Sequence, residues 1–254
     1  MIDIHCHLLP GIDDGPATNE ESLAMAETAI ADGITHVVCT PHASSGYFFD
    51  YQSVRRAIAA LQREVGDRLV LASGCDFHLM PENLVQLHKD PAPFCINQRD
   101  YLLVEFSNYS IPPSADQALH ELQLAGLHPI ITHPERNALI HEKPERLKEW
   151  VRRGCYAQVT AGALSESFGA GPRRDAEDWI EQGLIHFVAS DAHNTRNRPL
   201  RLRPAYASVA SRFGEEKARA LFVENPLAAF DGRPLPHAPP VVEAGPRRKR
   251  FFFF

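Results

Sequence analysis

The sequence predicts an α/β fold in which seven parallel strands form a barrel-like arrangement. The chain has 254 residues, and a single α/β barrel commonly takes about 250. Short apolar runs alternate with longer amphipathic ones, which is the pattern of repeated βα units. The short runs lack a clear two-residue alternation, as expected for strands covered on both faces. An open doubly wound sheet is the alternative that these patterns leave open.

The predicted strands are short runs that are mostly rich in Val, Ile or Leu. A run of this kind between turn residues indicates a buried strand. We predict strands at Met1–His5, Thr35–Thr40, Leu69–Cys75, Tyr101–Phe106, Pro129–Thr132, Tyr156–Thr160 and His186–Ser190.

Helix-like segments separate these runs, and a glycine follows most of them. The first begins with Thr18 as the cap and Glu21 three positions later, which is a capping box, and it ends before Gly33. The last is expected to end at Asn225-Pro226, because proline disrupts a continuing helix. The predicted helical segments are Thr18–Asp32, Gln52–Val65, Ser114–Ala125, Pro144–Arg153, Arg173–Gln182 and Leu202–Glu224.

Composition divides the chain into two parts. Residues 1–230 carry the alternating pattern and form one predicted barrel domain. From Asp231 to Phe254 the chain is first rich in proline, then basic, and it ends in four phenylalanines. We expect residues 231–254 to be a mostly disordered tail, because such a composition does not support a packed core.

Bulk composition narrows the class of protein. The formal net charge is −6, so a general nucleic-acid-binding surface is not expected. No apolar run approaches the roughly 18 residues that a membrane span needs, and the N-terminus lacks the pattern of a secretory leader. The five cysteines form no CxxC pair, which is typical of reduced thiols in the cytoplasm.

The cysteines do not predict a thiol-based phosphatase. Such an enzyme needs an arginine six positions after its nucleophilic cysteine, where it closes a phosphate-binding loop. The positions six residues after the five cysteines are Ile12, Ser45, Pro81, Tyr101 and Ala161. The GxSxG pattern of serine hydrolases and the phosphate-binding loop of nucleotide-binding proteins are also absent from the sequence.

Polar residues gather where the predicted strands end. In a parallel barrel the carboxyl ends of the strands share one mouth, so residues far apart in the sequence converge there. His5 and His7 lie two apart on an extended segment and point to the same face, while Cys6 points the other way. We interpret the set as a metal site, and its members at or just after strand ends are Asp3, His5, His7, His42, Asp76, Glu105, His133, Asp191 and His193.

The donor atoms and two nearby arginines point to phosphate chemistry. Imidazole nitrogens and carboxylate oxygens suit Mn, Fe or catalytic Zn. One aspartate of the turn Asp13-Asp14-Gly15 lies within reach of the same cluster. Arg136 and Arg198 follow closely after predicted ligands, and a guanidinium there suits a phosphate.

The motifs resemble the polymerase-and-histidinol-phosphatase (PHP) superfamily and, within it, the bacterial tyrosine phosphatases of capsule and exopolysaccharide synthesis. The resemblance runs in order from Met1 to about Phe230 and leaves out the tail. The residues that carry it are Asp3-Ile4-His5-Cys6-His7, Asp13-Asp14-Gly15, Thr40-Pro41-His42, Val104-Glu105-Phe106-Ser107, Thr132-His133-Pro134-Glu135-Arg136, Ala189-Ser190-Asp191-Ala192-His193-Asn194 and Glu224-Asn225-Pro226.

The resemblance implies a distorted seven-stranded βα barrel with three divalent metal ions, most often manganese, with iron or zinc as alternatives. Four carboxylates offset the charge of three such ions only in part, so the pocket attracts a phosphate dianion. Asp76 is a departure, because the relatives usually have Glu at this bridging position. The implied ligands are His5, His7 and Asp191 for one ion, Asp14, His42 and His193 for the second, and Glu105 and His133 for the third, with Asp76 shared; Arg136 and Arg198 match positions that contact phosphate.

The implied function is hydrolysis of phosphotyrosine by metal-activated hydroxide in the cytoplasm. The implied substrate is the tyrosine-rich tail of a bacterial autokinase that controls polysaccharide export. The loops Ser44–Tyr51 and Asn108–Pro113 carry aromatic residues that could contact it. Three alternatives stay open: histidinol-phosphate phosphatase, a nucleic-acid phosphoesterase, and a non-catalytic domain that binds a kinase tail. The sequence does not indicate an oligomeric state or a general acid.

Overall fold

The computed structural model describes residues 1–165 and 167–241. Its strands are all parallel and form a three-stranded sheet in the order β1-β2-β4 and a six-stranded sheet in the order β3-β5-β6-β7-β8-β9. The strands are β1 (Ile2–Cys6), β2 (His36–Cys39), β3 (His42–Ala43), β4 (Val70–Ser73), β5 (Asp76–His78), β6 (Tyr101–Glu105), β7 (His128–Thr132), β8 (Tyr156–Thr160) and β9 (Phe187–Ala189).

Two of the seven predicted strands are each followed, just past their predicted ends, by a second short strand. β3 continues the path of β2 after residues 40 and 41, and β5 continues β4 after residues 74 and 75. The break before β5 needs a glycine, because a Cβ on Gly74 would lie 2.8 Å from Val38 Cγ1. Strand neighbours follow chain order throughout, so the sheet has no reversal point and the doubly wound alternative is wrong.

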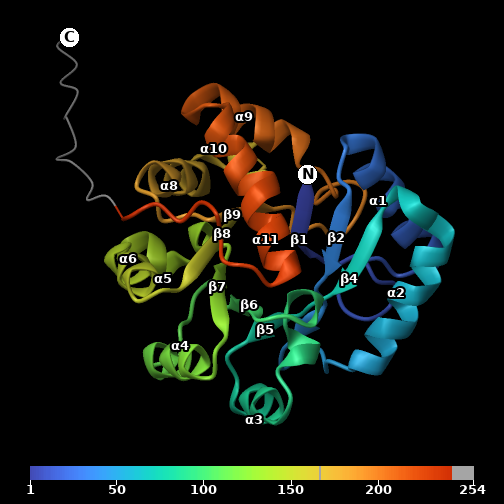
Figure 1. Cartoon of the computed structure of the whole chain (residues 1–254), viewed down its shortest axis with the longest axis horizontal. Helices are drawn as coiled ribbons and strands as arrows, with labels where there is room; N and C mark the ends of the chain where they lie inside the picture. Colours follow the sequence, from blue (N-terminus) through green and yellow to red (C-terminus); the bar gives the residue numbers. More distant parts are fainter. Residues whose placement is uncertain (166, 242–254) are drawn as a thin grey trace.

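The first and last strands lie side by side. The Asp191 amide, just after β9, donates to the His5 carbonyl at 2.9 Å, and the His7 amide donates to the Ala192 carbonyl at 2.9 Å. Asp3 adds a side-chain link, because its Oδ1 accepts from the Ser190 amide at 3.1 Å. The strands therefore form the barrel-like arrangement that the sequence predicts, with helices placed around them (Figure 1).

The register of β1 explains how two residues that are two positions apart face opposite layers. Asp3 pairs with Val37, but Cys6 pairs with Cys39, so three steps along β1 match two along β2. This β-bulge lets Ile4 pack in the smaller apolar cluster inside the strands while Cys6 packs in the larger cluster under the helices.

The helices cover the outside of the strands, and those before α11 bury residues in the larger apolar cluster. The capping prediction for the first helix is confirmed, since Thr18 Oγ1 accepts from the Glu21 amide and Gly33 ends the helix with φ 84°. The helices are α1 (Asn19–Asp32), α2 (Tyr51–Val65), α3 (Pro81–Lys89), α4 (Ala115–Leu124), α5 (Ala138–Glu142), α6 (Glu145–Arg152), α7 (Ala161–Leu164), α8 (Ala170–Glu181), α9 (Arg203–Phe213), α10 (Glu215–Arg219) and α11 (Asn225–Asp231), with short 3-10 turns at Gly66–Arg68, Ala92–Phe94, Ile96–Gln98 and Pro134–Arg136 and a π-helical turn at Ala220–Glu224.

The last predicted helix differs from the structure in two ways. Gly214 takes φ 93° and separates α9 from α10. The helix also continues past Asn225-Pro226 into α11, so the expected end there is wrong. Proline is tolerated in the first turn of a helix, where its missing N–H is not needed. Phe230 of α11 packs in the smaller cluster and contacts His36, so α11 covers the end of the barrel where β2 begins.

The segment after α11 is packed rather than free as far as the structure describes it. Tyr101 Oη donates to the Arg233 carbonyl at 2.9 Å. Asn225 is fully buried and bonds to His237 in both directions, at 2.8 and 3.1 Å. Hydrogen bonds to the buried side chains of Tyr101 and Asn225 thus hold the backbone at Arg233 and His237. The rest of the expected tail, 242–254, lies outside the described residues.

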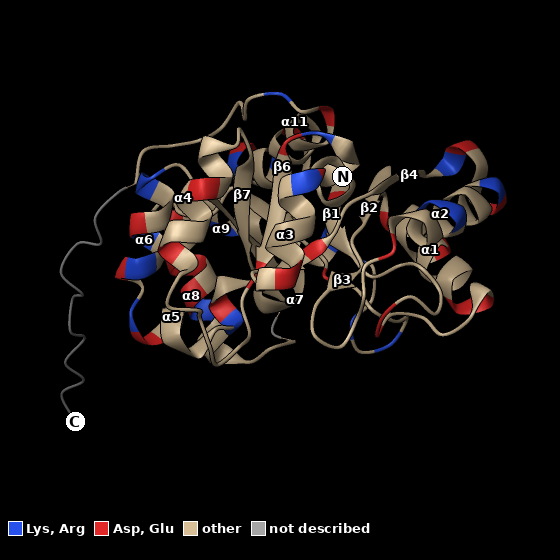
Figure 2. Cartoon of the chain, turned by 90° about the horizontal axis from the view of Figure 1, so that it is seen from below, with Lys and Arg blue, Asp and Glu red and all other residues tan. Residues whose placement is uncertain are grey.

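Charged residues are spread over the outer helices. Acidic and basic segments are interspersed on α2, α6 and α8 (Figure 2). Among the described residues, no helix is both long enough and apolar enough to cross a membrane.

Candidate metal centre

The mouth at the carboxyl ends of the strands collects the nine ligands that the resemblance implies into one connected cluster, whereas Asp3, also predicted, instead accepts from the backbone amides of His5 and Ser190. Each candidate lies between 3.2 and 3.6 Å from at least one other, measured between imidazole nitrogen and carboxylate oxygen. These side chains come from β1, the turn before α1, β3, β5, β6 and the segments after β7 and β9. Convergence of strand ends, expected from the parallel order, is thus observed for the predicted candidates.

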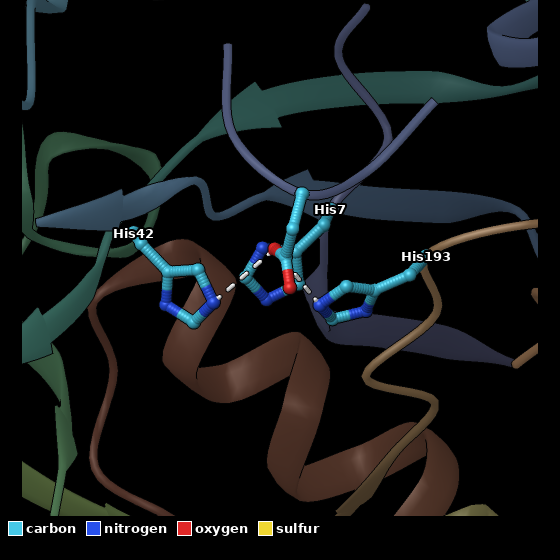
Figure 3. Close-up of side chains that lie close together, drawn as sticks. His7, His42 and His193 are labelled. Carbon is cyan, nitrogen blue, oxygen red and sulfur yellow. Dashed lines mark ion pairs between the residues drawn. The ribbon is translucent and has the colours of Figure 1, made fainter. Parts of the chain in front are cut away.

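One group surrounds Asp14. Its Oδ1 lies 3.2 Å from His193 Nε2 and 3.4 Å from His42 Nε2. The His7 ring stands between them, with its centroid 4.0 Å from that of His193 and 4.4 Å from that of His42. Figure 3 shows His7, His42 and His193 turning their rings toward this carboxylate. These four side chains offer ligand atoms within 4.8 Å of one another.

A second group surrounds Asp76, which is fully buried. Its Oδ2 lies 3.4 Å from His5 Nε2 and 3.2 Å from His42 Nδ1. Asp191, which lies just after β9, approaches His5 and His7, with its Oδ1 3.6 Å from His5 Nε2 and 3.4 Å from His7 Nε2. Asp76 thus sits where the different parts of the cluster meet, as expected for a shared ligand.

The third group is built on Glu105 at the end of β6. Glu105 Oε1 lies 3.4 Å from His133 Nε2, and Oε2 lies 3.3 Å from His42 Nδ1. His78, which the sequence reasoning missed, also faces Glu105 Oε2. A signal was present, because Asp76 and His78 repeat on β5 the two-residue spacing of His5 and His7 on β1.

The cluster fits divalent metal ions on two observations. Both oxygens of Asp76, Glu105 Oε2 and His193 Nε2 are buried without a hydrogen-bond partner, which is costly unless a cation satisfies them. The separations of 3.2 to 3.6 Å also suit shared coordination, because two ligand atoms about 2.1 Å from one ion stand about 3.0 to 3.4 Å apart. The residues present therefore fit a metal centre of nitrogen and oxygen donors.

The electrostatics of the cluster favour bound cations. Burial alone would lower the pKa of His5, but Asp76 and Asp191 raise it to about 9. Burial would raise the pKa of Asp191, yet His5, His7 and Arg198 hold it well below its usual value. The carboxylates therefore stay ionised and create a negative field that divalent cations can neutralise.

Buried polar residues behind the cluster fix the histidine rings. His7 Nδ1 donates to Asp13 Oδ2 at 2.6 Å, and His5 Nδ1 donates to Gln158 Oε1 at 3.0 Å. Each bond leaves Nε2 with its lone pair toward the cluster, which is the usual arrangement of a metal-ligating histidine. Gln158 was not singled out from the sequence, although a glutamine inside the apolar strand run at 156–160 is a visible signal.

Two of the candidates hold strained backbone conformations. His133 has φ 32° and Asp191 has φ 51°, both in the left-handed region; His133 directly follows β7, and Asp191 lies two residues after β9. Such a conformation costs about 1–3 kcal/mol for a residue other than glycine. In this conformation the chain turns away from the strand direction, and both side chains point into the mouth. The strained residues are therefore members of the candidate metal centre.

Two arginines flank Asp191. Arg136 Nη1 donates to Asp191 Oδ2 at 2.5 Å, and Arg198 Nη2 contacts the same oxygen. Phe168 lies under the Arg136 guanidinium, 5.2 Å from its ring centroid. A cavity of about 190 Å³ adjoins Arg198 and is lined in part by Phe168 and Ser190. Each guanidinium keeps further N–H groups that can bind an anion in the mouth.

The cysteines take no part in the cluster. All five are free and buried, and burial raises the pKa of Cys6 well above its ordinary value and that of Cys155 to about 12. A thiol with so high a pKa is not a nucleophile at neutral pH. Cys6 packs in the larger apolar cluster, away from the mouth.

We therefore predict that the chain needs no thiol for turnover. Replacing all five cysteines by serine should leave turnover of an aryl phosphate per folded molecule within about threefold of the wild type, since none reaches the reacting atoms. Steady-state kinetics normalised to the folded fraction measure this. Complete loss of activity in well-folded protein would contradict the assignment, and treatment of the wild type with a thiol-alkylating reagent is the matching control.

A cluster of nitrogen and oxygen ligands at the carboxyl end of a parallel barrel, with two arginines beside it, defines the class of metal-dependent hydrolases. The family model for capsular polysaccharide synthesis, CpsB/CapC, matches residues 1–231. The chain therefore belongs to the CpsB/CapC family, and the resemblance found in its motifs is confirmed.

Similar proteins agree with the family. The chain is 34% identical over 261 residues to the tyrosine-protein phosphatase YwqE of Bacillus subtilis, with 100% of each covered. It is 32% identical over 238 residues to the tyrosine-protein phosphatase CpsB of Streptococcus pneumoniae, covering 89% of this chain and 96% of that one. A crystal structure from work on these two proteins, described as metal-dependent tyrosine phosphatases, matches with a TM-score of 0.88 and 33% identity over 96% of this chain and 100% of the other.

Proposed function

We propose that this chain is a metal-dependent protein-tyrosine phosphatase that hydrolyses phosphotyrosine. The observation that carries the proposal is the cluster at the mouth, where Asp76 joins groups of histidines and carboxylates and two arginines stand beside them. Membership of the CpsB/CapC family and the names of its relatives support the same activity.

We propose three divalent ions, with manganese first and iron or zinc as alternatives. His5, His7 and Asp191 would hold one ion, Asp14, His42 and His193 a second, and Glu105 and His133 a third. Asp76 would be shared, because its Oδ2 faces histidines of two of these groups. Ions held there would lower the pKa of a water and offset the charge of the phosphoryl group.

The arginines bind and orient the phosphate in this proposal. Asp191 anchors both guanidiniums through one oxygen, Oδ2. Their planes are then fixed before substrate arrives, so that free N–H groups meet the phosphoryl oxygens without reorganisation. Phe168 restrains Arg136 further by stacking beneath it. The leaving phenolate is stable enough to need little protonation, and no general acid is assigned.

Aromatic residues around the mouth fit a peptide substrate. Phe48 is 78% exposed and Tyr109 is 82% exposed, on the loops that follow β3 and β6. Tyr47 stacks against His42, with ring centroids 5.9 Å apart. Exposed aromatic rings beside the ligands can contact a phosphotyrosine and its neighbours. We propose the tail of a bacterial tyrosine autokinase as the partner and the cytoplasm, where buried free thiols stay reduced, as the location.

Substrate comparison tests the proposal. The metal-loaded protein should hydrolyse a phosphotyrosine peptide with a kcat/KM at least about 100-fold above that for histidinol phosphate, because the open mouth and its exposed aromatic rings suit an aryl ester on a peptide. Elemental analysis of the same sample counts the ions. Preference for histidinol phosphate would reassign the substrate, and a phosphoserine peptide of the same sequence serves as the control for the aryl group.

A further inference from the structure

His78 lies beside Glu105 at the rim of the mouth, and the strands place it there. Asp76 and His78 are two residues apart on β5, so their side chains project from the same face. In the parallel pairing of β5 with β6, His78 is opposite Glu105. The His78 side chain is 24% exposed, while Asp76 beneath it is fully buried. His78 therefore stands on the solvent side of the Asp76–Glu105 pair.

The two carboxylates leave coordination capacity unused on the His78 side. Glu105 directs Oε1 toward His133, at 3.4 Å from Nε2, and directs Oε2 toward His78. Glu105 Oε2 and both oxygens of Asp76 are nevertheless buried without a hydrogen-bond partner. Unpartnered carboxylate oxygens buried next to an imidazole nitrogen are an arrangement that a cation satisfies better than hydrogen bonds do.

His42 cannot be a metal ligand both beside Asp14 and at the Asp76–Glu105 pair. Its Nε2 faces Asp14 at 3.4 Å, and its Nδ1 faces Asp76 Oδ2 at 3.2 Å and Glu105 Oε2 at 3.3 Å. A ligating imidazole ordinarily gives one nitrogen to the ion and directs the N–H of the other to a carboxylate. With Nε2 committed beside Asp14, His42 is not free to hold a second ion at the Asp76–Glu105 pair, and its buried Nδ1 makes no hydrogen bond to either carboxylate.

The shortness of Asp76 makes a further ligand useful. Aspartate reaches about 1.5 Å less far from the backbone than glutamate, which has one more C–C bond. Asp76 Oδ2 is drawn toward His5, at 3.4 Å, on the inner side of the cluster. The same oxygen lies 3.2 Å from His42 Nδ1, and an ion held by Asp76 and Glu105 would gain from a further donor on the solvent side. His78 fills that side, and His42, Asp76, His78 and Glu105 offer ligand atoms within 4.8 Å of one another.

We propose that His78 is a metal ligand that, together with Asp76, Glu105 and His133, holds the divalent ion nearest to β5, β6 and β7. The inference rests on the metal centre of the proposed function and assigns to it a ligand that the resemblance does not include. The donor set of two imidazoles and two carboxylates suits Mn²⁺, Fe²⁺ or Zn²⁺.

Metal binding tests this without relying on activity. Wild type, His78→Ala and His78→Gln are stripped with chelator, loaded with Mn²⁺, passed through a desalting column, and analysed for ions per chain. Titration calorimetry with Mn²⁺ gives the affinity of each site. We expect both variants to lose one ion per chain or to bind it at least about 10-fold more weakly, with the other ions unchanged. His128→Ala is the control, because His128 pairs with Asp100 at the start of β7.

A double variant tests the reason given for the ligand. If His78 compensates for the short Asp76, then Asp76→Glu in the His78→Ala background should restore the lost ion. Circular dichroism confirms that each variant is folded. Equal ion count and affinity in both His78 variants and the wild type would overturn the proposal. If activity then still fell, His78 would act on the substrate rather than on the metal. A wild type that binds no ion would instead reject the metal centre of the proposed function.

Discussion

Turnover of an aryl phosphate should fall by about 10³-fold or more when Asp76 is replaced by asparagine. Asp76 is fully buried and shares one oxygen between His5 and His42, at 3.4 and 3.2 Å. Asparagine keeps the shape but removes the negative charge, so the centre loses the ligand that joins its parts. Elemental analysis should find fewer ions per chain, and steady-state kinetics on folded protein measures the rate.

The control for this prediction is a carboxylate of similar chemistry outside the mouth. Glu27 forms an exposed ion pair with Arg68, at 2.7 Å, and Glu27→Gln should change neither the ion count nor the rate, since exposed pairs contribute little. An Asp76→Asn protein that keeps its full ion count and its rate would show that Asp76 is not a shared ligand.

Replacing either arginine by alanine should lower kcat/KM by about 100-fold while the ions stay bound. Arg136 and Arg198 both contact Asp191 Oδ2, and both are partly exposed in the mouth. The loss should affect both substrate binding and rate, because the guanidiniums meet charge in the ground state and in the transition state. Lysine should not restore the activity of Arg198, because it lacks the planar fork of donors.

Arg196 provides a matched control for the arginine variants, since it is an exposed arginine in the same loop as Arg198. Arg196→Ala should leave kcat/KM within about twofold, as expected for a surface substitution. Unchanged kinetics in Arg198→Ala would remove that residue from the site. Loss of ions in the same variant would show instead that it supports Asp191 as a ligand.

The strands and much of the cluster could be predicted from the sequence for a simple reason. In a parallel barrel, local pattern fixes where each strand ends, and the fold then brings those ends together. His5, His42 and His133 lie on or next to different strands and still meet through carboxylates. They meet because each lies near the carboxyl end of a parallel strand. No knowledge of long-range contacts was needed to nominate them.

What the sequence could not predict depends on contacts between distant segments. The bulge in β1 appears only when its register against β2 is known. Asn225-Pro226 resembles a helix end, yet α11 continues because burial of Ala229 and Phe230 against the strands outweighs the local signal. Composition alone also gives no sign that Tyr101 bonds to the Arg233 carbonyl and Asn225 to the His237 carbonyl. Tertiary packing overrides local preference in each case.

Metal removal is the most direct test of the central claim that bound ions, and no thiol, carry out the hydrolysis. The protein is stripped with chelator until elemental analysis finds no metal, and hydrolysis of a phosphotyrosine peptide is then measured before and after addition of Mn²⁺. We expect activity to disappear with the metal and to return with Mn²⁺, because the proposed reaction depends on metal coordination to lower the pKa of the attacking water. Full activity in verified metal-free protein would contradict this account.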